Sequence, residues 1–261
     1  MKLFIFGSTG DLVKRKIIPA FAGLKLEELE IIALGRQDFT NEMYEDFISK
    51  DKWFRNFRKK PVYHRIDFSR EIICEKCEEF LDNTENNFFY IAMPPDLIGK
   101  ILDYLGRIKK KGFKIKILIE KPFGKNLEDA KKLKRIINEK NLSEDIFLSD
   151  HYLFKEEIAG LKKTNFRKIK IVSLEKVGLE NRTYYDDVGA LRDMIQSHFL
   201  NIVFRLLENP EKEFSHFEIE EYKRAQYGNG KDKGYAKELG KKSDTETFAK
   251  VRLKTKDREF E

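Results

Sequence analysis

Residues 3–12 read Leu3-Phe4-Ile5-Phe6-Gly7-Ser8-Thr9-Gly10-Asp11-Leu12, and this stretch decides the fold. Its four apolar residues predict a buried β-strand, the segment 7–10 predicts a tight turn, and Asp11 and Leu12 open a helix. Glycines let a backbone approach phosphate closely, and a helix N-terminus supplies N–H groups. The stretch therefore predicts a nucleotide-binding turn, with an ordinary strand-to-helix turn as the alternative. We expect the apolar positions of the helix to be Ile17, Ile18, Phe21 and Leu24.

Apolar runs and helix-forming segments alternate from this stretch as far as residue 150. Further strands are expected at 31–34, 62–68, 88–92, 114–119 and 146–148. Helices are expected at 41–49, 97–109 and 126–139, and the basic, aromatic segment 52–60 is interpreted as a helix with its rings turned inward. Such alternation is typical of a parallel sheet with helices on both faces.

The pattern changes after residue 150. We expect a long strand at 166–175, a helix at 187–207, strands at 214–222 and 245–255, and a mobile loop rich in glycine and lysine at 227–243. Strands separated by such long connecting segments favour antiparallel pairing. The expected fold is an α/β Rossmann-type parallel sheet in residues 1–150, followed by a partial α+β domain with a mainly antiparallel sheet in residues 151–261.

Composition excludes several classes of protein. The 261 residues include 52 basic and 45 acidic side chains, which gives a net charge of +7. A basic surface suits anionic ligands, but the lysines are interleaved with glutamates, so no nucleic-acid partner is expected. No apolar run approaches the roughly 18 residues of a membrane span, and the N-terminus reads as a strand, so we expect a cytoplasmic protein. Cys74 and Cys77 have no second pair nearby, and no metal site is expected.

The end of the second expected strand bears on the choice of cofactor. An NAD site usually places an acid near this position to accept the ribose hydroxyls. This chain has Arg36 directly after Gly35, with Asp38 two residues further on. Because an arginine suits a 2′-phosphate, we expect NADP, and a solvated surface arginine is the alternative.

Two further clusters follow expected strands. Lys121 stands before Pro122 in a stretch where a cis bond is possible, so its amine is either rigidly aimed or part of a surface turn. The segment Asp150-His151-Tyr152-Leu153-Phe154-Lys155 places an acid, an imidazole, a phenol and an amine within six residues. Open α/β sheets bind ligands outside the carboxyl ends of their strands. These clusters are therefore site candidates, and an exposed charged turn is the alternative for the second one.

His198 lies on the expected helix 187–207. At α-helical spacing it shares an apolar stripe with Met194 and Ile195, whereas Asp193 lies about 140° away and should not touch it. One interpretation is a buried, hydrogen-bonded core histidine. The other is a general base shielded from water, which needs an orienting carboxylate from elsewhere. Asp150 is the candidate for that carboxylate.

Several of these stretches occur together in an order that is typical of one enzyme family. They are Gly7-Ser8-Thr9-Gly10-Asp11-Leu12, Gly35-Arg36, Glu120-Lys121-Pro122-Phe123-Gly124, Asp150-His151-Tyr152-Leu153 with Lys155-Glu156, Tyr184-Tyr185-Asp186, Arg192-Asp193-Met194-Ile195-Gln196 with His198, and Ser243 with Thr245-Glu246-Thr247-Phe248. In this order and spacing the chain resembles the glucose-6-phosphate dehydrogenase family. The resemblance implies NADP-dependent oxidation of glucose 6-phosphate at C1 to 6-phosphoglucono-lactone, the first step of the oxidative pentose phosphate pathway.

The resemblance also implies a role for each site residue. His198 would take the proton from the C1 hydroxyl, and Asp150 would orient it, as carboxylates orient imidazoles in other enzymes. The sugar phosphate would be held by His151, Tyr152 and Lys155. The sugar hydroxyls would be bonded by Lys121, Glu175 and Asp193. NADP would be held by Gly7, Ser8, Thr9, Gly10, Asp11, Leu12, Arg36 and Lys121.

Some positions depart from the family pattern. Phe154 replaces a glycine and is expected to crowd the phosphate pocket, Ser197 replaces an asparagine, and the loop between Glu175 and Tyr184 is one residue shorter. Family members continue beyond the position of Glu261 with further strands, much of a dimer interface and two substrate-binding lysines. We therefore expect a C-terminally truncated short form, with a fragment as the alternative, that acts as a homo-oligomer or with a completing partner chain. The alternatives are a sugar oxidoreductase of the glucose–fructose oxidoreductase type and a non-catalytic NADP- or sugar-phosphate-binding protein.

Overall fold

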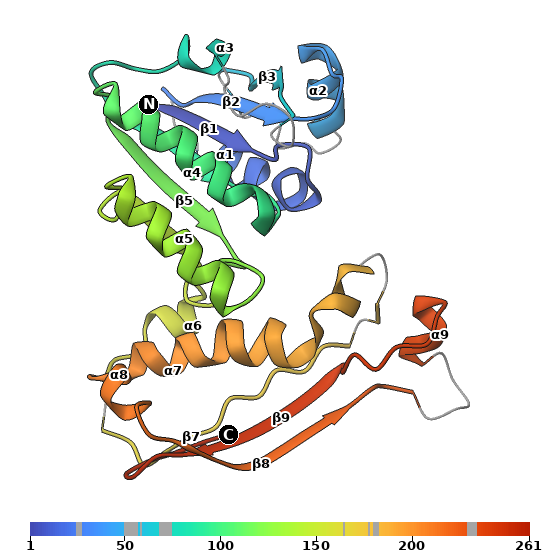
Figure 1. Cartoon of the computed structure of the whole chain (residues 1–261). Helices are drawn as coiled ribbons and strands as arrows, with labels where there is room; N and C mark the ends of the chain where they lie inside the picture. The colour runs from blue at the N-terminus through green and yellow to red at the C-terminus, as the bar shows by residue number, and fades with distance from the viewer. Residues whose placement is uncertain are drawn as a thin grey trace. The chain divides into compact units, whose positions relative to one another are not determined.

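A computed structural model describes the chain from residue 1 to 261, except for residues 25–27, 50–56, 58, 68–74, 164, 177, 180–182 and 229–233. The chain forms two compact units, Met1–Ser149 and Asp150–Glu261. They are the blue-to-green and the yellow-to-red parts of Figure 1. Most of the expected helix at 52–60 lies outside the described residues. Among the helices in the described ranges, none has the length and apolar character needed to cross a membrane.

The first unit is built on a sheet of six parallel strands in the order β3-β2-β1-β4-β5-β6. The strands are β1 (Lys2–Phe6), β2 (Glu30–Gly35), β3 (Val62–Arg65), β4 (Asn87–Ile91), β5 (Ile115–Glu120) and β6 (Ile146–Ser149). This confirms the expected parallel sheet. The order reverses beside β1, whose two neighbours are β2 and β4, and dinucleotide-binding folds hold their ligand at such a reversal.

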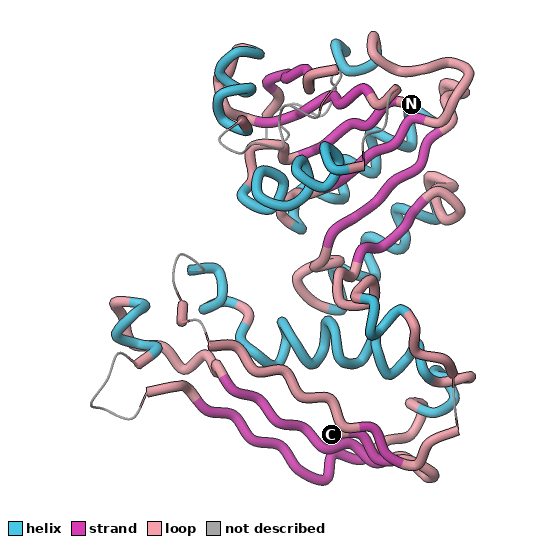
Figure 2. The backbone as a smooth tube through the Cα atoms, turned by 180° about the vertical axis from the view of Figure 1, so that it is seen from behind, coloured by secondary structure: helices cyan, strands magenta, loops and turns pink. Residues whose placement is uncertain are grey.

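Helices cover both faces of this sheet (Figures 1 and 2). They are η1 (Val13–Ile17), α1 (Ile18–Gly23), α2 (Asn41–Ile48), α3 (Glu75–Glu78), α4 (Pro95–Lys110) and α5 (Leu127–Glu139). Side chains alternate along β1, so Phe4 and Phe6 join the core under α4 and α5, while Leu3 and Ile5 join the core under α1 and α2. The Asn126 side chain caps α5 by accepting a hydrogen bond from the N–H of Asp129.

The helix after the glycine turn differs from the α-helical expectation. Residues 13–17 form the π-helix η1, in which backbone bonds join residues five apart. The buried positions are therefore Val13, Ile18 and Ala22, spaced by five and then by four. Leu24, which α-helical spacing assigned to the apolar face, is 61% exposed, so that expectation is wrong.

The second unit places a long helix on a sheet of four strands in the order β7-β10-β9-β8. The strands are β7 (Lys168–Ile169), β8 (Glu218–Ala225), β9 (Phe248–Lys254) and β10 (Glu259–Phe260). Pairing is antiparallel except between β10 and β7, which confirms a mainly antiparallel sheet. The helix consists of the π-helix η4 (Leu191–Phe199) and α7 (Leu200–Leu206), and it runs along the sheet (Figure 1). Its Val203 packs with Leu253 and Phe260 of the sheet. The short helices are α6 (Glu156–Ala159), η3 (Thr183–Asp187), α8 (Pro210–Glu213) and α9 (Tyr235–Leu239).

Two expectations for this unit were wrong. The strand expected at 166–175 shrinks to β7, because its ladder partner in the described part of the chain, β10, has only two residues. Figure 2 shows the segment that follows β7 as an extended loop. The segment 227–243 was expected to be an irregular, mobile loop, but it contains helix α9, whose Tyr235 side chain is buried.

Candidate active site

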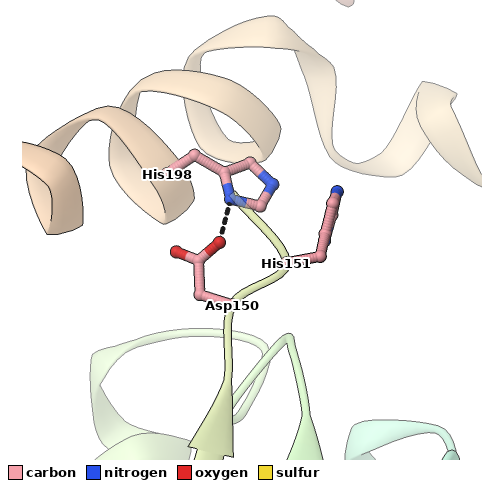
Figure 3. A group of neighbouring side chains, drawn as sticks. All are labelled: Asp150, His151 and His198. Atoms are coloured by element: carbon pink, nitrogen blue, oxygen red, sulfur yellow. Dashed lines mark hydrogen bonds and ion pairs between the residues drawn. The ribbon is translucent and has the colours of Figure 1, made fainter. Parts of the chain in front are cut away.

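The predicted contact between Asp150 and His198 is present in the second unit. Asp150 directly follows β6, and His198 lies near the C-terminal end of η4. Asp150 Oδ1 lies 2.6 Å from His198 Nδ1 (Figure 3). Both residues are buried, with Asp150 6% and His198 2% exposed. The core-histidine interpretation correctly anticipated the burial, but the partner that burial requires is a carboxylate.

The remaining bonds of Asp150 keep its carboxyl group ionised. Its Oδ1 accepts a second hydrogen bond from the N–H of Tyr152 at 3.0 Å, and its Oδ2 accepts one from Asn201 Nδ2 at 2.9 Å. Burial by itself would raise the pKa of Asp150, but the bonds from Asn201, His198 and Tyr152 outweigh it and lower the pKa. A carboxylate only accepts, so Nδ1 of His198 carries the proton of their bond. The lone pair of the neutral ring therefore sits on Nε2.

Tyr152 lies between His198 and a lysine. The ring centroids of Tyr152 and His198 are 4.0 Å apart at an interplanar angle of 34°, so the imidazole covers one face of the phenol. Lys155 Nζ lies 3.8 Å from the centroid of the same phenol ring. Both groups cannot occupy one face at these distances, so the ammonium lies over the other face, in a cation–π contact. Tyr152 thereby separates the positive charge of Lys155 from the imidazole.

The neighbouring residues His151 and Phe154 are both exposed. The ring of His151 meets that of His198 edge to face, with centroids 4.8 Å apart. The Phe154 side chain is 72% exposed, and the expectation that it crowds the phosphate pocket stays a prediction. Ser197, the other departure from the family pattern, donates its hydroxyl to the carbonyl of Arg192 at 2.8 Å.

The π-helical form of η4 changes the reasoning about Asp193. The angle of about 140° between Asp193 and His198 assumed α-helical spacing. In a π-helix, residues five apart stand in successive turns on one side of the helix, so that argument against their proximity does not hold. The helix is held at its N-terminal end by Glu246, which accepts a hydrogen bond from the N–H of Leu191 at 3.0 Å and pairs with Arg224 at 2.9 Å.

Glu175 and Asp193 lie together at a cavity. The cavity has a volume of about 780 Å³ between the helix and the sheet of the second unit, and both carboxylates line it beside Tyr185. Burial, together with the negative charges of Asp193, Glu246 and Glu175, raises the pKa of Tyr185 to about 12. Tyr152 connects this cavity to His198, since its hydroxyl lies 3.9 Å from Sδ of Met194, another lining residue.

The glycine turn lies in the first unit, between β1 and the helix that begins at Asp11. Gly7 has φ of +82°, and a Cβ atom there would lie 2.2 Å from the carbonyl oxygen of Ala92. The helix that follows begins at Asp11, and its first N–H groups have no partner within the helix. The Ser8 hydroxyl is buried and has no hydrogen-bond partner among the described residues. Ser8 is thus directed inward, whereas Gly10, Asp11 and Leu12 face solvent.

Other predicted residues of the first unit lie at strand ends. Arg36 follows β2 and is exposed. Asp38, the nearby acid, lies 3.4 Å from Arg65 at the end of β3, so a second arginine stands at this edge. Lys121 follows β5, and the bond between Lys121 and Pro122 is cis, as the sequence suggested.

Sequence reasoning missed the roles of Asn201 and Glu246. Asn201 stands three residues after His198, a spacing that places two side chains on one side of a helix, and this could have flagged it as a partner of Asp150. Glu246 was noticed only as part of a motif. Its capping bond to Leu191 joins residues 55 positions apart, and no local pattern predicts such a bond.

Models of one family match most of the chain. The glucose-6-phosphate dehydrogenase NAD-binding domain matches residues 4–159, and the C-terminal domain of the same enzymes matches residues 159–224. The chain belongs to the glucose-6-phosphate dehydrogenase family. A glucose-6-phosphate dehydrogenase solved in complex with its substrate glucose-6-phosphate superposes with a TM-score of 0.79 at 25% identity, covering 99% of this chain and 66% of that one. A putative myo-inositol dehydrogenase from Sinorhizobium meliloti has a TM-score of 0.63 at 13% identity, which shows a shared fold only.

Curated family members are substantially longer. The chain is 32% identical to glucose-6-phosphate 1-dehydrogenase of Buchnera aphidicola subsp. Schizaphis graminum, over 77% of this chain and 48% of that protein. It is 31% identical to the Bacillus subtilis enzyme, over 80% of this chain and 50% of that protein. The chain thus spans about half the length of these relatives. Alignment with the Chlamydia pneumoniae enzyme runs over 322 positions, more than the 261 residues of the chain, so that relative carries internal segments absent here.

Proposed function

We propose that this protein oxidises glucose 6-phosphate at C1 with NADP to 6-phosphoglucono-lactone, the first step of the oxidative pentose phosphate pathway. The observation that carries the proposal is the buried Asp150–His198 pair, with 2.6 Å between Oδ1 and Nδ1, in a member of this family. Similarity to a family structure described as a complex with glucose-6-phosphate supports the choice of substrate. The proposal includes the cytoplasmic location expected from the sequence.

In this reaction His198 acts as the base. Its Nε2 lone pair takes the proton of the C1 hydroxyl, while Asp150 holds Nδ1–H and stabilises the positive imidazolium that results. Asn201 and the N–H of Tyr152 keep Asp150 ionised and fixed, which makes the site ready before substrate arrives. NADP, when bound, accepts the hydride that leaves C1.

The substrate is held by two groups of residues. The exposed His151 and Lys155, together with the Tyr152 hydroxyl, take the sugar phosphate, because a histidine and an ammonium complement its negative charge. Glu175 and Asp193 accept hydrogen bonds from the sugar hydroxyls at the cavity edge. Lys121 contributes a further donor from the carboxyl end of β5.

We infer that residues 1–150 bind NADP. The Gly7 turn is the candidate for the pyrophosphate, because it joins β1 to a helix N-terminus and a side chain at Gly7 would collide with the carbonyl oxygen of Ala92, so the turn requires glycine. Asp11 and Leu12 are exposed at the start of the following helix, where the first N–H groups have no partner within the helix. Arg36 and Arg65 complement a 2′-phosphate, and pairing with Arg65 engages Asp38, the acid that NAD would otherwise use.

Residues 151–261 would bind the sugar phosphate and support oligomerisation. Strand β8 forms one edge of the second sheet, and all of its residues except Glu221 are exposed. An exposed edge presents unpaired backbone groups that can pair with another chain. We infer that the protein acts as a homo-oligomer or with a completing partner chain.

The proposal is tested by NADPH formation from glucose 6-phosphate, followed by absorbance. His198→Asn should lower kcat by roughly 10²–10⁴-fold, the usual contribution of a positioned base. His216→Asn, which changes an exposed histidine bonded to Ser215, is the matched control and should keep full activity. Failure of the purified protein to form NADPH, with or without a partner chain, would contradict the proposal. Arg36→Ala should raise KM for NADP more than KM for NAD.

A further inference from the structure

Three side chains that commonly bind metals converge at the carboxyl end of β6. Asp150, His151 and His198 each offer one ligand atom, and these atoms lie within 4.8 Å of one another (Figure 3). Imidazole nitrogens suit Zn²⁺, Cu²⁺ and Ni²⁺ in particular. No local sequence pattern predicted this cluster, because His151 and His198 are 47 positions apart and the familiar spacing rules for zinc ligands apply to residues closer together.

We propose that a divalent transition-metal ion of the Zn²⁺ class binds between His198 Nε2 and His151, with Asp150 as the orienting carboxylate. A metal-bound histidine almost always donates its other ring N–H to a carboxylate or carbonyl, which fixes the ring and increases its basicity. Asp150 already makes that bond, at 2.6 Å from Nδ1 of His198. The arrangement therefore contains the supporting part of a metal site as well as two ligands.

The surroundings of the two histidines allow an ion to bind. His151 is exposed, which gives access from solvent and lets its side chain adjust. Ligands on a tetrahedral Zn²⁺ at about 2.0–2.1 Å lie roughly 3.4 Å apart, so ligand atoms that lie within 4.8 Å of one another would have to approach by at most about 1.4 Å. The ionised Asp150 offsets the added positive charge, and the Tyr152 ring stands between Lys155 and His198. Water would fill the remaining coordination positions.

Metal binding would inhibit the reaction proposed above, and this part of the inference rests on that proposed function. The neutral His198 ring has a single lone pair, on Nε2. That lone pair either accepts the proton of the C1 hydroxyl or binds the metal, and it cannot do both. The exposed His151, which would hold the sugar phosphate, is engaged by the same ion. The ion would therefore inhibit the reaction reversibly, because it occupies both the base His198 and the phosphate-binding His151.

Binding can be measured without any turnover. The purified full chain is titrated with Zn²⁺ by calorimetry and with Co²⁺ by visible absorption, in the absence of sugar and nucleotide. We expect one ion per chain and no sulfur-to-cobalt charge-transfer band, since the ligands are nitrogens. Asp150→Asn should weaken binding about 10–100-fold, the usual effect of removing an orienting partner. His151→Gln, at an exposed position, should weaken it at least as much, whereas His216→Gln should leave it unchanged.

The outcomes separate the metal site from the enzyme. Equal affinity in the unaltered chain and His151→Gln, a sulfur band, or no binding would overturn the metal site. If Zn²⁺ binds and lowers NADPH formation, and a chelator restores NADPH formation, both the metal site and its inhibitory role are supported. If Zn²⁺ binds with full turnover, the blocking role is overturned. A chain that binds Zn²⁺ through His151 but never forms NADPH would retain the metal site and refute the proposed function.

Discussion

The two sheets of this protein are stabilised in different ways. In the first unit, β1 is buried along four of its five residues, and apolar side chains cover the sheet on both faces. In the second unit, the helix η4–α7 covers one face, where Leu253 and Phe260 contact Val203. Residues that alternate with these point to the opposite face. The strands and the residues next to their ends carry opposite charges that form ion pairs, among them Lys168–Glu259, Lys170–Glu261, Lys250–Glu221 and Arg252–Glu261.

This difference indicates which unit is the more stable and which one contains the candidate catalytic pair. Ion pairs whose side chains remain accessible to solvent contribute little to stability, typically up to about 1 kcal/mol each, whereas burial of apolar side chains dominates it. The Asp150–His198 pair lies in the unit with the smaller apolar core. Functional segments are commonly drawn from the less stable parts of a protein. We therefore expect local opening of the second unit to occur more readily than opening of the first.

The largest contrast should come from truncating one leucine in each core. Leu105→Ala, at a fully buried position under the first sheet, should cost about 3–5 kcal/mol, because it leaves a cavity in a well-packed core. Leu253→Ala, at a half-buried position that already lines a cavity, should cost roughly 1–2 kcal/mol. Hydrogen exchange resolved by peptide reports the opening of each unit separately. Equal costs would show that the two cores are equally well packed.

The next contrast is between two glycines of the first unit, both with positive φ. A Cβ at Gly7 would lie 2.2 Å from the oxygen of Ala92, whereas Gly112, with φ of +96°, has no such neighbour within 4 Å. Gly112→Ala should cost about 1–2 kcal/mol from backbone strain alone. Gly7→Ala should cost more, at roughly 2–4 kcal/mol, and should also weaken NADP binding. Urea unfolding and NADP calorimetry measure the two effects, and similar losses at both sites would refute the close-approach argument.

A smaller contrast concerns the N-terminal ends of helices. In the first unit, Asn126 caps α5 from three residues away, and Asn126→Ala should cost about 0.5–2 kcal/mol. In the second unit the distant Glu246 serves η4, and Glu246→Ala should cost about 1–3 kcal/mol, because it removes a buried acceptor and the partner of Arg224. Glu246→Gln keeps an acceptor and should recover much of the loss. The urea midpoints of the three variants measure these losses of stability. If Glu246→Ala has no effect on stability, η4 is held by packing alone.

The smallest contrast concerns two aspartates whose pKa values are both lowered to about 2. Hydrogen bonds from the N–H groups of Glu85 and Thr84 lower that of Asp82. Bonds from Lys241 and Ser243 lower that of Asp186. A lowered pKa means that each carboxylate adds stability above the unfolded value of about 3.9, and this is lost as pH falls through about 2. Salt at about 1 M screens charges beyond about 3 Å. Carboxyl NMR titration should then show the pKa of Asp186 rising more than that of Asp82. Equal rises would contradict the explanation that the charge of Lys241 lowers the pKa of Asp186.

Some features followed from local patterns and others required the folded chain. The apolar run 3–6 and its successors predicted the parallel sheet, because buried strands need apolar side chains on both faces. The pairing of Asp150 with His198 was predicted from chemistry, since a buried base needs an orienting acid. Leu24 was assigned wrongly, because periodicity at 3.6 residues per turn cannot register a π-helical turn before it. The strand expected at 166–175 has an alternating pattern, but its length was limited by the partner strand.

The π-helical segment Leu191–Phe199 has a consequence for how the protein tolerates changes in length. Asp193 lines the cavity and His198 meets Asp150, and the residues between them set the angle from one to the other. Deleting a single residue there would rotate everything on its C-terminal side by one residue position around the helix axis. Either the carboxylate would leave the cavity or the imidazole would leave its partner. A one-residue deletion, harmless in many helices, would here separate the two halves of the site, so this segment should be the least tolerant of insertions and deletions in the second unit.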